Sequence, residues 1–372
     1  MKILRSVCRI VIGLVFIFSG TVKAIDPLGS SYKFHDYFHA FNLGFLNWLS
    51  LPLAIILCTA EFISGFSVLT GLRLKTGIWG VMILMVIFTP LTFILALTNP
   101  VSDCGCFGDA IHLTNWQTFG KNIILIALAA ILFFNRKQIK NLFSTFTEWV
   151  IISVTILLFI LFSFYNLRYL PVLDFLPYKT DVKIADKMIV PEGVMVDEYK
   201  TTFTYIKSGV RKEFDLNNYP ANDTAWKFVD QKSVIIKKGY QPPIHDFIIT
   251  SVDGEDITQK VLSNPGLSLF MVSGKLTDAG KKMILTGFEL GKYCKENGID
   301  FYILTASGAE EVKRYDNGLL FCTVDETTLK TMIRANPGYI LLKDGSIIGK
   351  WSWANVPERE WFKQQVEAVL PK

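Results

Sequence analysis

Five apolar segments in the first half of the chain constrain its fold more than any other feature. They run over Ile3–Val22, Trp48–Leu69, Gly77–Leu97, Trp116–Phe134 and Trp149–Leu167. Each is long enough to cross the hydrocarbon core of a bilayer as a helix, which takes about 20 residues. Because charged residues recur throughout the chain after Leu170, we expect an α-helical membrane bundle followed by a soluble domain.

Composition supports this division and narrows the kinds of partner. Hydrophobic residues make up 51% of the chain, and the net charge is a modest +5. The basic residues lie beside the apolar segments and form no continuous stripe. We therefore expect contact with a lipid bilayer and no binding of nucleic acid.

Lysine and arginine residues near the ends of these segments predict the orientation of the chain. They cluster before the first segment, between the second and third, and between the fourth and fifth: Lys2, Arg5, Arg9, Arg73, Lys75, Arg136, Lys137 and Lys140. Because such residues stay on the cytoplasmic side, we expect a multi-pass protein of the cell inner membrane with a cytoplasmic N-terminus. Loops 23–47 and 98–115 and everything after residue 167 are then periplasmic. A cleaved signal peptide is the alternative for the first segment, and it leaves this orientation unchanged.

The soluble part of the sequence shows two patterns. Residues 171–240 read as an extracytoplasmic β-rich linker region, with a hairpin predicted around Ser208-Gly209. From residue 241 strands and helices alternate, which predicts a three-layer α/β domain over 241–372. Its expected elements include a buried strand at Leu267–Val272, helices at Thr277–Asn297, Glu326–Ala335 and Pro357–Leu370, and hairpins at Asp253-Gly254 and Asp344-Gly345. The membrane bundle then covers 1–135, and a cytoplasmic loop and fifth transmembrane helix cover 136–170.

The loop between the third and fourth apolar segments holds two of the six cysteines, Cys104 and Cys106, separated by Gly105. Outside the cytoplasm, neighbouring thiols tend to be oxidised. A disulfide that encloses one residue is strained, and strain favours exchange over a structural role. Gly105 supplies the backbone freedom that such a turn requires. The pair is therefore our candidate redox site; a structural bridge, or two small residues in a tight loop, are the simpler alternatives.

A metal site is another use of the same loop. Cys104, Cys106 and His112, with Asp103 or Asp109, offer ligands for zinc or copper, although their spacing matches no strong zinc pattern. The two aspartates also raise the pKa of neighbouring thiols, which disfavours reactive thiolates.

An acidic residue, Glu61, lies near the middle of the second apolar segment, three residues after Cys58. A carboxylate at that depth costs about 3 kcal/mol on insertion scales. We expect it to face the bundle interior, neutral or near Lys23 or Arg73. We interpret Glu61 as a candidate proton relay or a contact for a quinone, the candidate cofactor; a helix-packing hydrogen bond is the simpler alternative.

The membrane segments resemble a known family. The motifs Gly20-x-x-Lys23, Asp26-Pro27 and Glu61-x-x-x-Gly65 are similar to those of the DoxX-like membrane proteins. The Cys-Gly-Cys-Phe-Gly sequence before the fourth segment is more specifically similar to MauE, the methylamine-utilisation membrane proteins. The resemblance covers four helices over residues 1–135, and it implies a role in extracytoplasmic disulfide or electron transfer.

From about residue 241 the chain resembles the thioredoxin fold of TlpA and peroxiredoxin-like proteins. The likeness rests on the hairpin at Asp253-Gly254 and on residues 335–351, in which Pro337 stands at the family's cis-proline position. Where the family has Cys-x-x-Cys, this chain has Ser273–Leu276, so no thiol nucleophile stands there. Cys294 and Cys322 are expected to be buried and inert, or joined in a structural bridge.

Three functions remain open at the level of the sequence. The first is a membrane thiol-disulfide oxidoreductase, in which Cys104 and Cys106 exchange electrons with an extracytoplasmic thiol protein and the bundle passes them to a quinone. The second is a non-enzymatic scaffold whose thioredoxin-like domain is a binding module. The third is a membrane protein that handles a metal or small solute through Glu61 and the cysteine loop.

Overall fold

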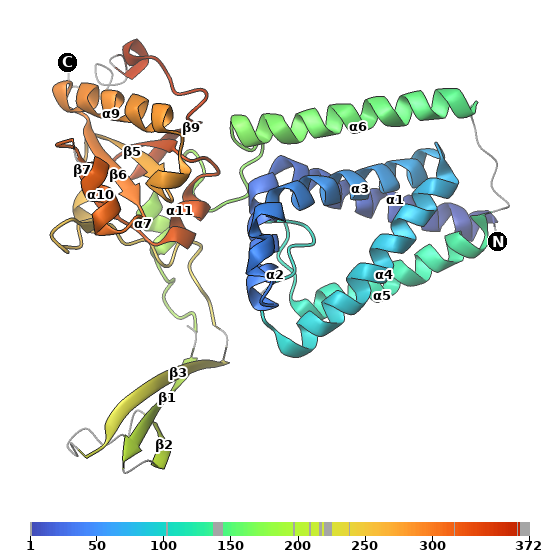
Figure 1. Ribbon diagram of the computed structural model, residues 1–372, viewed down its shortest axis with the longest axis horizontal. Helices are drawn as coiled ribbons and strands as arrows, with labels where there is room; N and C mark the ends of the chain where they lie inside the picture. The colour runs from blue at the N-terminus through green and yellow to red at the C-terminus, as the bar shows by residue number, and fades with distance from the viewer. Residues whose placement is uncertain are drawn as a thin grey trace.

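Five long apolar helices make up the first part of the chain (Figure 1). The computed structural model describes residues 2–101, 103–136, 144–195, 198–207, 210–215, 218, 225–237, 239–315, 317–362 and 364. Within these residues, five helices are long and apolar enough to cross a membrane. Four begin and end close to the predicted segments, and the fifth starts a few residues early: α1 (Lys2–Ile25), α3 (Ser50–Thr70), α4 (Leu74–Thr98), α5 (Asn115–Phe134) and α6 (Thr145–Arg168).

Helices α1 and α3 approach each other closely because a glycine lies at their contact. A Cβ atom added at Gly20 would lie 2.7 Å from the backbone oxygen of Cys58 and from the backbone nitrogen of Phe62. Only glycine leaves room for such an approach, as small residues do at many membrane helix contacts. The glycine therefore lets side chains one turn further along α1 reach the polar positions of α3.

A helix that the sequence analysis did not predict, α2 (Pro27–Ala40), crosses the ends of the bundle helices (Figure 1). It is followed by the short 3-10 helix η1 (Gly44–Leu49), which contains Trp48. Asp26 caps α2 by accepting a hydrogen bond from the Gly29 backbone nitrogen at 2.8 Å, and Pro27 occupies the first turn. An aspartate before a proline is a recognised helix start, which explains a helix in loop 23–47, for which the sequence analysis predicted only a location.

The C-terminal part of the chain is a mixed α/β domain built on a six-stranded sheet. The strand order is β4-β7-β6-β5-β8-β9. Strand β5 pairs in parallel with β6 and antiparallel with β8. The strands are β4 (Thr250–Ser251), β5 (Leu267–Ser273), β6 (Asp300–Thr305), β7 (Leu320–Thr323), β8 (Gly338–Lys343) and β9 (Ser346–Ser352).

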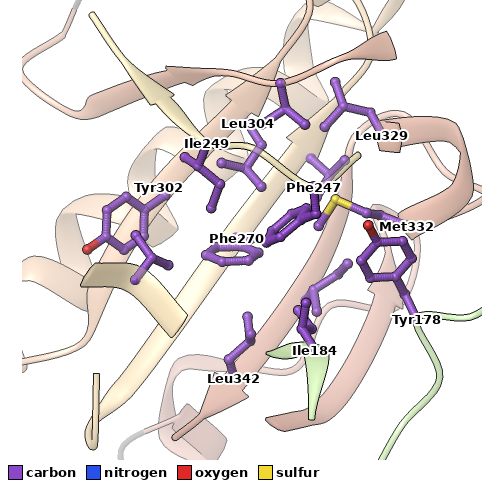
Figure 2. Close-up of a cluster of buried hydrophobic side chains, with 14 of the residues drawn as sticks. Tyr178, Ile184, Phe247, Ile249, Phe270, Tyr302, Leu304, Leu329, Met332 and Leu342 are labelled. Atoms are coloured by element: carbon purple, nitrogen blue, oxygen red, sulfur yellow. The ribbon is translucent and has the colours of Figure 1, made fainter. Parts of the chain in front are cut away.

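Helices cover both faces of this sheet, which confirms the predicted three layers. One apolar core, drawn in Figure 2, includes Phe247 and Phe270 together with residues of α8 (Thr258–Leu262) and α11 (Glu326–Met332). The other core packs α9 (Lys281–Glu296) on the opposite face. Tyr178 and Ile184 belong to the first core. The segment from Tyr178 to the end of α7 (Ile184–Met188) therefore folds with this domain.

Several predicted boundaries within the domain shift by a few residues. The helix expected at Thr277–Asn297 is split: a 3-10 turn, η3 (Leu276–Asp278), precedes α9, which begins after Gly280. Helix α11 ends at Met332, three residues early, and the short α10 (Ala309–Tyr315) was not predicted. The turn at Asp253-Gly254 forms, but its ladder is a single bridge between Thr250 and Asp256. Half of the helix expected at Pro357–Leu370 lies outside the described residues, and residues 359–362 and 364 are helical.

A separate three-stranded sheet stands apart from both the bundle and the α/β domain (Figure 1). Its order is β2-β1-β3, with β1 (Glu198–Lys207), β2 (Val210–Asp215) and β3 (Lys227–Lys237). Lys207 pairs with Val210 in an antiparallel ladder, as the predicted hairpin requires. The expected turn residues, Ser208 and Gly209, lie outside the described residues.

The α/β domain is fastened to one end of the bundle, here called the domain-facing end, by charged and polar contacts. The Arg334 guanidinium binds the carboxylates of Asp26 and Asp109 at 2.8 and 2.7 Å. Ser352 donates a hydrogen bond to the backbone oxygen of Arg168 at 2.7 Å. Lys350 pairs with Asp174 at 2.6 Å. The N-terminus lies at the opposite end of the bundle (Figure 1).

Candidate functional site

The structure joins Cys104 and Cys106 in a disulfide at the domain-facing end of the bundle. Their Cα atoms lie 5.5 Å apart, and Gly105 between them has a φ of 64°. A side chain is disfavoured in that conformation. A Cβ atom added at Gly105 would also lie only 2.9 Å from Cγ of Lys33. Both requirements explain a glycine between the two cysteines.

The cysteine loop is folded inward beneath α2 rather than extended from the membrane surface. Ser19 of α1 lies within hydrogen-bond distance of the backbone oxygen of Cys106, at 2.7 Å. Tyr37 of α2 donates to the backbone oxygen of Cys104 at 2.6 Å. Phe107 packs edge-on against Phe18 of α1, with ring centres 5.5 Å apart. Helices α1 and α2 therefore hold the loop, and both cysteines remain partly exposed.

Glu61 faces the bundle interior, as expected for a carboxylate in the second apolar segment. It is 6% exposed. Its oxygens accept hydrogen bonds from the Lys23 ammonium at 2.8 and 2.7 Å and from the Ser19 hydroxyl at 2.8 Å. Of the two candidate partners, the structure selects Lys23; Arg73 lies over the ring of Trp149 instead. The ion pair is satisfied, as a buried charge must be.

The aspartate before the first cysteine, Asp103, ties the loop to α2. Its carboxylate lies 3.1 Å from the Lys33 ammonium and 3.8 Å from Nδ1 of His112. Burial raises the pKa of Asp103, but the contacts with His112 and Lys33 outweigh it and lower that pKa to about 2. The hydrogen bond to Asp103 in turn raises the pKa of His112. At neutral pH the loop therefore carries an ionised Asp103.

The His112 contact predicts a pH dependence of loop anchoring. Because the folded pKa of His112 is raised, its stabilising effect is full below the ordinary value of about 6.5 and is lost as pH rises through the folded value. Exposed pairs of this kind contribute about 0.2–1 kcal/mol. We expect reduction of the disulfide by a phosphine to accelerate by at most about fivefold over that window. The His112→Ala variant should be fast throughout, and parallel profiles for the two proteins would contradict the assignment.

The alternative metal ligands do not converge in the described residues. The sulfurs of Cys104 and Cys106 are bonded to each other. His112 contacts Asp103, whereas Asp109 contacts Arg334. Among the residues that the structure describes, no group of three histidine, cysteine or acidic side chains is placed to hold a metal ion.

A cavity of about 110 Å³ lies inside the bundle beneath the cysteine loop. Cys104, Gly105 and Cys106 form part of its wall. Most of the lining is apolar and comes from α1, α2, α3, α4 and α5. The polar side chains that reach it are Ser19, Lys23, Ser30, Lys33, Tyr37, Glu61, Thr92, Lys121 and Asn122.

The α/β domain presents no thiol near its proline loop, in agreement with the sequence. Ser273 lies at the end of β5 and its hydroxyl is 2.7 Å from Oδ1 of Asn336. The peptide bond from Asn336 to Pro337 is cis, as the thioredoxin resemblance implies. Cys294 and Cys322 are free and buried on opposite faces of the sheet. Burial raises the pKa of each thiol to about 12, so the suggested bridge is absent and both are unreactive at neutral pH.

Sequence reasoning missed several residues around the disulfide. Ser19, Lys33, Tyr37 and Lys121 carry no motif of their own, because each becomes relevant only when α1, α2 and α5 pack around the loop. Lys121 had one signal: it is a lysine six residues into a membrane helix, where an unneutralised charge is costly. Asp26 had another, since Asp26-Pro27 marks the start of α2.

The arrangement defines a class: a multi-pass membrane protein with a disulfide in a loop that folds into one end of its bundle. Residues 1–135 match the family described as methylamine utilisation protein MauE, and residues 199–238 match a domain of unknown function, DUF8463. The membrane region is thus MauE-like, and the three-stranded sheet, apart from Glu198, falls within the second match.

Two further comparisons add little. The search of curated proteins found no match to the chain. Among solved structures, the chain is similar to the solution structure of a candidate protein disulfide isomerase from Bacteroides thetaiotaomicron. The two are 16% identical, with 34% of this chain and 86% of that chain covered and a TM-score of 0.27. The description of the α/β domain rests on its strand order and proline loop instead.

Proposed function

We propose that this protein is a membrane thiol-disulfide oxidoreductase whose Cys104–Cys106 disulfide exchanges with the thiols of an extracytoplasmic partner. The observation that carries the proposal is the disulfide itself, partly exposed and lying in the wall of a membrane cavity next to a buried lysine–glutamate pair. A disulfide that closes so small a ring cross-links almost no chain, so it contributes little stability. Reversible chemistry accounts for it better than a structural role.

An extracytoplasmic location of the domain-facing end is part of the proposal. Disulfides persist in oxidising compartments and are rare in the cytosol. The clusters of lysine and arginine at the other ends of the helices favour the same orientation. We therefore place the cysteine loop and the α/β domain in the periplasm of a cell inner membrane.

The exchange reaction follows from the surroundings of each sulfur. A partner thiolate attacks Cys104, on the side of α2 and the exposed His112; the disulfide breaks, and Cys106 leaves as a thiolate. A second partner thiol attacks the mixed disulfide, so the partner gains a disulfide and the pair becomes two thiols. The two protons that the partner thiols lose balance the two that Cys104 and Cys106 take up.

Nearby charges favour this direction of reaction. The acidic residues that would destabilise a thiolate are both paired, Asp103 with Lys33 and Asp109 with Arg334. Lys121 lies over the ring of Phe107, the residue after Cys106, at 4.4 Å and lines the same cavity as Cys106. Cations near a sulfur lower its pKa and improve it as a leaving group.

The α/β domain then has a binding role in the same reaction. It lacks a thiol in the described residues around Pro337 and is held against the loop by Arg334. We propose that it covers the loop and docks the partner, as a thioredoxin-like binding module.

The test is a redox titration of the full-length protein in lipid nanodiscs. Samples equilibrated with dithiothreitol buffers of graded potential are alkylated with a polymer-linked maleimide and separated on a gel. We expect two thiols per chain to open and close reversibly, and the oxidised protein to form a disulfide in a reduced dithiol peptide. A pair that stays closed over the whole range, or opens without oxidising the peptide, would favour the non-enzymatic scaffold.

A further inference from the structure

Contacts among the described residues account for some, but not all, of the polar side chains that line the cavity beneath the disulfide. Glu61 is saturated by Lys23 and Ser19. Lys33 pairs with Asp103, and Tyr37 donates to Cys104. Asn122 donates to the hydroxyl of Thr92 at 3.1 Å. These groups close the walls of the cavity and leave two others to be explained.

Those two are the ammonium of Lys121 and the hydroxyl of Ser30. Within the described residues, Lys121 has no carboxylate in ion-pair range, and its contact is the face of the Phe107 ring at 4.4 Å. The Ser30 hydroxyl is buried and has no hydrogen-bond partner among the described residues. Both side chains line the cavity. The Ser30 hydroxyl is a buried donor without an acceptor in the described part of the chain, which is costly, and Lys121 is a half-buried ammonium in a largely apolar cavity. The cavity therefore suits a ligand that supplies oxygen acceptors.

The chemistry of the ligand is limited by where the cavity lies. Membrane-spanning helices form most of its wall, and α2 and the cysteine loop form the rest. We therefore expect the ligand to come from the bilayer and to be largely apolar. Its 110 Å³ is small beside the 300–1,000 Å³ of typical sites for whole ligands. The cavity therefore holds a head group, while the rest of the molecule remains elsewhere.

The proposed exchange supplies the last constraint, and this inference rests on it. Each catalytic cycle leaves Cys104 and Cys106 as thiols, and their reoxidation needs an acceptor of two electrons and two protons. A quinone meets the three requirements. It is lipid-soluble, its carbonyl oxygens accept hydrogen bonds, and it takes up two electrons and two protons, with negative charge developing on those oxygens during reduction.

We infer that the cavity binds the head group of a lipid-borne quinone, with Lys121 and Ser30 donating to its carbonyl oxygens. The two S–H bonds break, the Cys104–Cys106 bond forms, and the quinone takes two electrons and two protons to become a quinol. This inference assigns the carbonyl contact to Lys121 rather than to Glu61, because the Glu61 oxygens already accept hydrogen bonds from Lys23 and Ser19, whereas an ammonium can donate to a carbonyl. The role of Glu61 as a proton relay stays a prediction.

The role of Lys121 is tested by the rate at which the reduced protein is reoxidised. Full-length protein in nanodiscs is reduced, freed of reductant and mixed anaerobically with decylubiquinone or, separately, with the water-soluble oxidant diamide. The ratio of the two rates cancels any general effect on the thiols. We expect Lys121→Met to lower this ratio by about tenfold or more and Lys121→Arg to retain much of it. Lys75→Met, an exposed lysine at the start of α4, is the matched control.

Each other outcome is decisive. If decylubiquinone does not oxidise the wild-type pair while diamide does, or if Lys121→Met keeps the wild-type ratio, the quinone site is wrong and the exchange reaction stands. If oleate protects Lys121 from amine labelling and decylubiquinone does not, the cavity binds an anionic lipid, which overturns the inference. If neither decylubiquinone nor diamide restores the Cys104–Cys106 disulfide, both the quinone site and the proposed thiol-disulfide exchange are wrong.

Discussion

The Cys106→Ser variant is expected to accumulate a covalent adduct with its thiol partner, whereas Cys104→Ser forms none. The backbone oxygen of Cys104 accepts a hydrogen bond from Tyr37 of α2, and the preceding Asp103 contacts the exposed His112. The backbone oxygen of Cys106 lies 2.7 Å from the Ser19 hydroxyl, on the α1 side of the loop. We therefore expect Cys104 to be the sulfur that a partner reaches. A partner thiol that attacks Cys104 is then released only by a further thiol once Cys106 is gone. Net oxidation of a dithiol peptide should fall to the uncatalysed rate in both variants.

The measurement is a non-reducing gel of membranes after rapid acid quenching, together with the peptide oxidation rate. Loss of so short a cross-link lowers stability by only about 1–2 kcal/mol in the chain-entropy estimate, so both variants should fold. Cys294→Ala, in the core of the α/β domain, is a control that should leave oxidation unaltered. Adducts on Cys104→Ser alone would reverse the assigned order of attack, and full activity in both variants would remove the cysteine pair from the mechanism.

The Arg334→Leu variant is expected to release the α/β domain from the bundle. Its guanidinium bridges the carboxylates of Asp26 and Asp109, hydrogen-bonds the backbone oxygen of Lys330 and lies over the ring of Tyr32. Arg334 is 7% exposed, so removing it leaves two poorly solvated carboxylates. Breaking one side of a buried ion pair costs about 3–5 kcal/mol, which is comparable to the whole stability of many domain contacts.

Hydrogen exchange of α2 and the cysteine loop measures this release. We expect faster exchange over residues 27–40 and 103–112 in Arg334→Leu, with little change in the strands of the sheet, because their two cores do not include Arg334. Arg334→Lys should fall between, since a lysine cannot bind both carboxylates as a planar fork. Lys281→Met, an exposed lysine at the start of α9, is the control. If hydrogen exchange in Arg334→Leu is unchanged, Arg334 does not hold the domain to the bundle, and the contact between Ser352 and the backbone of Arg168 does so instead.

Much of the fold follows from local sequence. The five apolar helices, the three layers of the α/β domain, the antiparallel pairing of β1 with β2 and the hairpin at residues 344–345 all follow from periodicity and turn residues. The errors occur where a helix is amphipathic or interrupted. Helix α2 is mostly polar and short, so length and hydropathy do not reveal it, and only its Asp26-Pro27 start does. The break before α9 lies at Ala279 and Gly280, between two stretches that each read as helix.

The candidate site was predictable only in part. Glu61 had to face inward because lipid excludes a carboxylate, and a lysine or arginine was its natural partner. The choice of Lys23 over Arg73 depends on the depth at which α1 and α3 cross, which Gly20 sets. The donors Lys121 and Ser30 come from α5 and α2, and no motif links them to Cys106.

Local composition by itself determined which segments enter the membrane, because transfer of each segment from water to lipid depends on its own side chains. It also brought the two sulfurs together, since one residue separates them, and it removed any thiol from positions 273–276. Only the tertiary structure decided what surrounds the disulfide. Arg334 meets Asp26 across 308 positions in the chain, and Ser19 meets Cys106 across 87. Such pairs form only when whole helices and domains pack together. Short-range sequence patterns carry no information about contacts between residues so far apart in the chain.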